Sequence, residues 1–152
     1  MVTLEQFRYC PTHTTHPPFC YDFHYVKPGM VAIFGDNGSG KSTLAQLMAG
    51  WYPDFLPGEI TGTGTLLGTP IGRLPFNEQS ATIQLVQQSP YLQLSGCTFS
   101  VEEEVAFGPE NLCLAEAEIM ARIDAALTLT ECQPLRHRHP ATLSGGETQR
   151  VV

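Results

Sequence analysis

Residues 35–42 read GDNGSGKS and match the pattern G-x-x-x-x-G-K-[ST]. The glycines let the backbone curl, so that successive N–H groups converge on phosphate oxygens, and the helix expected to follow adds a favourable dipole. We expect Lys41 to bridge the β- and γ-phosphates of ATP, Ser42 to hold Mg²⁺, and Thr43 to lie near the α-phosphate. The alternative is a glycine-rich turn with a surface lysine. The predicted ATP-binding residues of this phosphate loop are Gly35, Asp36, Asn37, Gly38, Ser39, Gly40, Lys41, Ser42 and Thr43.

A second candidate anion site lies near the end of the sequence, where residues 143–147 read LSGGE. A hydroxyl and two glycine amides at a helix N-terminus form a group of donors that suits a phosphate. The alternative is an ordinary helix-capping turn. The residues of this LSGGE turn are Leu143, Ser144, Gly145, Gly146 and Glu147.

Five metal-ligand residue types occur between positions 10 and 24: Cys10, His13, His16, Cys20 and His24. Their spacing is one that a zinc site could use. The alternative, which we prefer, is a polar, proline-rich loop between two strands in which these residue types occur by chance. The sequence alone leaves metal binding by these residues open.

The composition restricts the classes of partner. A net charge of −7 and a pI near 5.1 argue against unassisted binding to nucleic acid or anionic lipid. The one basic cluster, RHRH at 136–139, is interpreted as a solvated loop. No run approaches the ~18 apolar residues of a membrane-spanning helix, and the first residues do not resemble a secretory signal. The five cysteines contain no C-x-x-C pair and are expected to be free thiols.

Hydrophobic patterning predicts strands first and helices later. We expect strands at 2–9, 19–26, 30–34 and 81–87, the third of them buried on both faces. A helix is expected from 42 to 49, and residues 56–75 are expected to form short strands and turns. Residues 115–129 have helical periodicity, and SVEE at 100–103 is a capping-box pattern. The prediction is an α/β protein with a β-rich nucleotide-binding part (1–97) and a helical part (98–152).

The phosphate loop and the LSGGE turn together resemble the ATP-binding-cassette (ABC) ATPases, which carry a Walker A loop and an LSGGQ signature. The resemblance implies a P-loop NTPase core with a helical subdomain. It also implies that the LSGGE turn acts in trans, capping the γ-phosphate held by a second ATPase subunit of a homo- or heterodimer. Glu147 replaces the commoner glutamine, which leaves the Ser-Gly-Gly core intact.

Two more positions gain roles from the same resemblance. Gln88, in QQSP at 87–90, matches the glutamine loop and would contact Mg²⁺ or the attacking water; the alternative is an exposed loop residue. Tyr9 lies where the family has an aromatic residue that stacks on adenine. Because stacking needs only a ring face, a core or edge-strand tyrosine is nearly as compatible with the sequence.

The string SVEEEVAFGPENL at 100–112 resembles the ATPases of energy-coupling-factor transporters, which import cobalt, nickel and vitamins. The alternative is an ordinary capped helix. The resemblance implies integral membrane partners, no nucleic acid, and a peripheral location on the cytoplasmic side of the cell membrane. It does not identify the transported substrate.

In the family, the signature precedes a strand ending in the Mg²⁺-binding Asp, then the catalytic Glu and a later His. Residues 1–152 contain only Val151 and Val152 after Arg150. We therefore expect a fragment that lacks the C-terminal strands of the core, that has negligible ATPase activity alone, and whose strand at 30–34 lacks neighbours.

Three functions remain open at this point. The first is the N-terminal part of an importer ATPase. The second is a non-hydrolysing nucleotide-binding module that lends its LSGGE turn to an intact partner. The third is a DNA-repair or chromosome-organising ATPase, which the short spacing between the motifs and the acidic pI disfavour.

Overall fold

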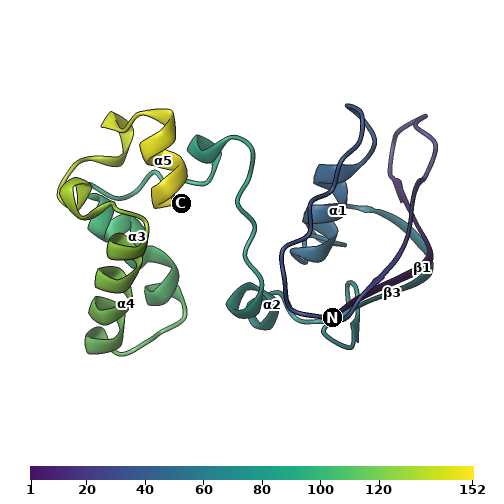
Figure 1. Cartoon of the computed structure of the whole chain (residues 1–152), viewed down its shortest axis with the longest axis horizontal. Helices are drawn as coiled ribbons and strands as arrows, with labels where there is room; N and C mark the ends of the chain where they lie inside the picture. The colour runs from purple at the N-terminus through teal and green to yellow at the C-terminus, as the bar shows by residue number, and fades with distance from the viewer. The chain divides into compact units, whose positions relative to one another are not determined.

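The computed structural model describes the backbone of residues 1–152 and every side chain except those at positions 76 and 77. The chain forms two units, residues 1–85 and 86–152 (Figure 1). Each unit has its own cluster of buried side chains. The phosphate loop belongs to the first unit, and the LSGGE turn belongs to the second.

The first unit is built on a four-stranded antiparallel sheet with the order β2-β1-β3-β4. Its strands are β1 (Val2–Pro11), β2 (Phe19–Tyr25), β3 (Gly58–Leu66) and β4 (Thr69–Pro70). The expected strands at 2–9 and 19–26, and the short strands within 56–75, are therefore confirmed. Leu4, Phe7 and Tyr9 share the buried face of β1, where a register shift separates Leu4 from Phe7. They pack with helix α1 (Lys41–Met48), which confirms the helix expected at 42–49.

Two expected strands are absent from the structure. Residues 30–34 are not in a sheet, and Met30 and Phe34 are 100% and 90% exposed. The segment 81–87 begins inside helix α2 (Phe76–Thr82) and continues as unpaired backbone. The predictions were wrong because a strand needs a neighbour to satisfy its N–H and C=O groups, and neither segment pairs with another strand in this structure.

The second unit is helical, as expected. Its helices are α3 (Val101–Asn111), α4 (Glu116–Leu129) and α5 (Gly145–Val151), with 3₁₀ turns at η1 (Pro90–Leu92), η2 (Gln133–Leu135) and η3 (Pro140–Thr142). Helices α3 and α4 lie side by side (Figure 1) and share a core with Leu143. Since Leu143 is 5% exposed, the LSGGE turn begins at a residue fixed in this core.

A buried glutamine joins α2 to the end of α1. The Gln79 side chain is 4% exposed, and its Nε2 donates to the Met48 carbonyl over 2.9 Å. It lies against Gly50, where φ is +81° and a Cβ would fall 2.3 Å from the Gln79 Cδ. Gln79 therefore satisfies a carbonyl that the end of α1 leaves without a helical donor.

We predict that Gln79→Ala lowers the free energy of unfolding by about 1–3 kcal/mol, because it leaves the Met48 carbonyl without its donor. Urea unfolding followed by Trp51 fluorescence measures this change in the first unit, since Trp51 is the chain's one tryptophan. Alanine at the exposed Gln84 is the matched control. Equal unfolding midpoints for the two variants would contradict the assignment.

Candidate functional site

The phosphate loop leads directly into helix α1. Gly38 and Gly40 have φ of +83° and +91°, in the left-handed region that glycine adopts without strain. Gly40 is the N-cap of α1, and the first helical hydrogen bond joins Leu44 N to Gly40 O over 2.8 Å. The backbone N–H groups of α1 that come before Leu44 have no acceptor within the helix, so they can donate to an anion.

The Lys41 ammonium group lies over the loop. Its Nζ donates to the carbonyl oxygens of Gly35 and Asp36, each over 2.8 Å, and contacts the Ser39 Oγ at 3.4 Å. The loop thus brings one cation and several backbone donors to one place, which fits a polyphosphate. The structure brings the predicted residues 35–43 together as one loop and helix start.

Strand β2 anchors this loop. The Tyr21 hydroxyl donates to the Gly40 carbonyl over 2.8 Å, and a Cβ on Gly40 would fall 2.6 Å from both the Tyr21 hydroxyl and the Phe19 ring. Burial, with smaller effects of Cys20 and Tyr9, raises the pKa of Tyr21 to about 12, so it remains a hydrogen-bond donor at neutral pH. Sequence reasoning missed Tyr21, because alternation shows only which face of β2 it occupies.

Tyr9 lies in the core. It is fully buried, and its hydroxyl donates to the Pro57 carbonyl over 2.9 Å. Burial raises the pKa of this hydroxyl. Stacking on adenine would require an open ring face, and Tyr9 has none in this structure. Of the two roles that the sequence left open, this position favours the core one.

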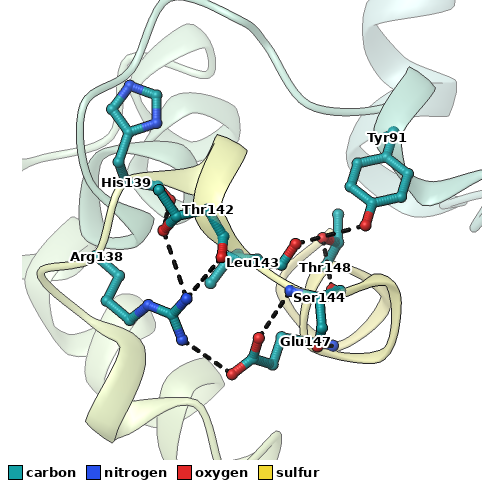
Figure 2. A network of polar contacts seen from close by, with 8 residues as sticks. All are labelled: Tyr91, Arg138, His139, Thr142, Leu143, Ser144, Glu147 and Thr148. Carbon is teal, nitrogen blue, oxygen red and sulfur yellow. Dashed lines mark hydrogen bonds and ion pairs between the residues drawn. The ribbon is translucent and has the colours of Figure 1, made fainter.

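The LSGGE turn forms a complete capping box at the start of α5 (Figure 2). The Ser144 Oγ accepts from Glu147 N at 3.4 Å, and the Glu147 carboxylate accepts from Ser144 N at 2.7 Å. These bonds lower the pKa of Glu147, and the nearby Arg138 lowers it further. Gly146 has no atom within 4 Å of where a Cβ would stand, so the turn is open beside its glycines.

The basic cluster at 136–139 is exposed at His137, Arg138 and His139, as expected of a solvated loop, but both of its arginines form ion pairs. Arg136 pairs with Glu102 at 2.6 Å and Asp124 at 2.5 Å, while Arg138 pairs with Glu147 at 3.0 Å. The bond from Arg136 is the largest cause of the lowered pKa of Glu102. The sequence did not predict these ion pairs, because the partners become neighbours only after folding.

The glutamine-loop segment reaches the LSGGE turn through Tyr91. Gln88 itself is exposed, as the alternative for it required. Three residues later, the Tyr91 hydroxyl donates to the Leu143 carbonyl over 3.4 Å, and it lies 3.7 Å from where a Cβ on Gly145 would stand. The aromatic residue was missed because its partner is 52 residues away.

The SVEEEVAFGPENL segment begins α3 with Ser100 as N-cap, since its hydroxyl accepts from Glu103 N at 3.2 Å. Glu103 bonds back to Phe99 N at 2.7 Å rather than to the cap residue. Glu104 accepts from the backbone and the hydroxyl of Ser95 at 2.6 and 2.7 Å. Ser100 caps the helix as predicted, but the capping box is incomplete because Glu103 does not bond to Ser100 N. The acidic first turn of the helix holds the preceding loop.

The cysteines and histidines at 10–24 do not gather around a common point. Among the side chains that the structure describes, no three His, Cys, Asp or Glu residues lie as metal ligands would. His24 bonds to the Thr3 hydroxyl at 2.7 Å, and His16 stacks on Phe19.

Within the described residues, no helix combines the length and hydropathy needed to cross a bilayer.

The chain matches a known protein family and several of its members. The family described as "ABC transporter" matches residues 21–152. The energy-coupling factor transporter ATP-binding protein EcfA1 of Levilactobacillus brevis is 42% identical over 80% of this chain and 41% of its own length. This chain spans at most about half the length of the first curated relatives that it matches, with a share of 53% in one case.

Solved structures agree on the fold. CbiO1 of Clostridium perfringens, described as part of the ABC transporter complex CbiONQ, is 30% identical with a TM-score of 0.80, covering 99% of this chain and 58% of that one. The ATP-binding cassette MJ0796, described as a dimer in a post-hydrolysis state with ADP and phosphate, is 21% identical with a TM-score of 0.75, covering 99% and 66%. The architecture is thus an α/β ATPase fold with a partial core.

Proposed function

The chain belongs to the ABC transporter family, and from this membership we propose that it is the ATP-binding part of an importer ATPase of the energy-coupling-factor type. One observation carries the proposal: the chain has both a phosphate loop that opens helix α1 and an LSGGE turn that opens helix α5. The first would bind Mg-ATP on this chain, and the second would contact the nucleotide of another ATPase subunit.

The residues present fit a nucleotide. Lys41 has exchangeable partners, because its three contacts are to loop carbonyls and a hydroxyl rather than to a carboxylate. When bound, ATP supplies the phosphates and Mg²⁺ neutralises part of their charge. We propose that Ser42 holds the metal and that Gly35–Thr43 hold the phosphates.

The partners follow from the same proposal. The relative CbiO1 is described as part of a transporter complex, and the cassette MJ0796 is described as dimeric. By analogy, a second ATPase subunit would face the LSGGE turn, and membrane components would contact the segment that precedes α3. The location would then be peripheral, on the cytoplasmic side of the membrane.

Calorimetry and ATP turnover test the proposal together. We expect Mg-ATP to bind the isolated chain through the phosphate loop. We expect its ATP turnover to be negligible, because the motifs identified in residues 1–152 include no carboxylate that activates water. Absence of Mg-ATP binding would overturn the proposal. Adding an intact ATPase subunit separates the two forms of it: turnover that depends on Ser144 would favour the module that lends its turn to a partner.

A further inference from the structure

The Glu147 carboxylate has a separate donor for each oxygen (Figure 2). Its Oε2 accepts from Ser144 N at 2.7 Å, and its Oε1 accepts from Arg138 Nη1 at 3.0 Å. The other arm of the guanidinium, Nη2, donates to the Thr142 carbonyl over 2.6 Å. Arg138 therefore bonds on both sides of Ser144, to Thr142 just before the LSGGE turn and to Glu147 at its end.

This arrangement requires a glutamate rather than a glutamine at position 147. A carboxylate has two acceptor oxygens, whereas an amide has one oxygen and an NH₂ group that only donates. With glutamine at this position, either Ser144 N or Arg138 would face a donor. The departure of Glu147 from the commoner residue thus has a physical explanation in this chain, namely a second donor on Arg138.

The backbone of Arg138 is fixed as well as its side chain. Its carbonyl accepts from Val101 N at 3.0 Å, at the first residue of α3. The Arg138 side chain is 42% exposed and that of Glu147 is 24% exposed, so the ion pair is partly screened by solvent. Arg138 accordingly connects the start of α3 to the LSGGE turn through its main chain and its side chain.

We propose that Arg138 is a positioning residue for the LSGGE turn, which it holds through Glu147 and the Thr142 carbonyl while its charge balances the carboxylate beside a phosphate-binding turn. This inference rests on the proposed function, because the balance matters only if the turn meets the phosphates of a nucleotide. Without Arg138, an unpaired carboxylate would repel those phosphates.

The first measurement uses the full chain without nucleotide. In Arg138→Met, the pKa of Glu147, followed by carboxyl NMR, should rise, because a neighbouring positive charge has been removed. Arg122→Met is the matched control, since Arg122 forms an exposed ion pair with Glu118 at 2.6 Å on α4. A Glu147 titration that is the same in both variants would overturn the proposal whatever ATP does.

The second measurement is self-association in Mg-ATP, followed by sedimentation velocity. Arg138→Met should weaken it about three- to tenfold, and Arg122→Met should leave it unchanged. Adding Glu147→Gln to Arg138→Met should restore most of the loss, because the unpaired charge is gone and the amide oxygen still accepts from Ser144 N. A merely structural arginine would give a double variant at least as weak as the single one.

The outcomes separate the two proposals. If wild type associates with Mg-ATP and the double variant is not rescued, the role of Arg138 is overturned while the proposed function stands. If wild type neither binds Mg-ATP nor associates, the proposed function fails, and the role of Arg138 falls with it even when the Glu147 titration responds as expected. Rescue by the second substitution, with an unchanged Arg122 control, supports both.

Discussion

Replacing Lys41 with alanine will reduce Mg-ATP affinity, measured by calorimetry, at least about a hundredfold, which corresponds to about 2.8 kcal/mol of binding free energy. Lys41 is the one cation within the phosphate loop, and charge-assisted bonds to phosphate each contribute about 1.5–3 kcal/mol. In the free protein the ammonium group bonds only to the carbonyls of Gly35 and Asp36 and to the Ser39 hydroxyl. These partners can return to water when the side chain is truncated.

The chain offers a natural control for this experiment. Lys27 is its only other lysine and is exposed, so Lys27→Ala makes the same change in net charge away from the loop. Circular dichroism establishes that both variants are folded. If Lys41→Ala bound Mg-ATP with the affinity of Lys27→Ala, residues 35–42 would not be a nucleotide site.

The second large effect is expected at the LSGGE turn. Ser144→Arg should leave Mg-ATP affinity unchanged, because Ser144 is not among the residues proposed to hold this chain's own nucleotide, and should abolish ATP-driven dimerisation. The turn is open beside Gly146, and under the proposed function a long side chain there would occupy the space of the phosphates bound by a second subunit. Sedimentation velocity with and without Mg-ATP measures the dimer.

Loss of the helix cap must be distinguished from loss of the contact. Ser144 caps α5, and removing such a cap costs about 1 kcal/mol of stability. Ser144→Asn keeps a capping oxygen but replaces the hydroxyl, and Ser100→Ala removes the equivalent cap from α3. If Ser100→Ala weakened dimerisation as much as Ser144→Arg, general destabilisation would explain the result and the role of the turn would be lost.

The features that the sequence predicted well are those that depend on near neighbours. The phosphate loop needs glycines and a lysine within eight positions, and the capping box at Ser144 needs a glutamate three residues later. Both are set by local backbone geometry. Strand β2 also followed from alternation within its own segment.

The strand expected at 30–34 failed for the opposite reason. Its apolar composition indicates burial on two faces, but burial depends on other elements that must lie beside it. In this structure Met30 is fully exposed, and no strand pairs with the segment. The apolar pattern alone therefore did not predict whether the segment is buried. The unpaired segment 83–87 has the same explanation.

Arg138 and Tyr91 are site residues that could not be predicted from the sequence. Their partners, Glu147 and the Leu143 carbonyl, lie 9 and 52 residues away in sequence. A basic cluster and a lone aromatic residue carry no signal for such contacts when only one sequence is read. Folding creates the site by bringing the segment before α3, the cluster at 136–139 and the start of α5 into one unit.

The hydrogen bond between Tyr21 and Gly40 has a consequence for the edge of the sheet. Strand β2 has a neighbour on one side only, and such strands open locally more often than central ones. A ligand that binds the loop around Gly40 would also stabilise the hydrogen bond from Tyr21 to Gly40. Part of its binding free energy would therefore oppose local opening of β2. Nucleotide binding would then slow the hydrogen exchange of β2 amides that the nucleotide does not contact.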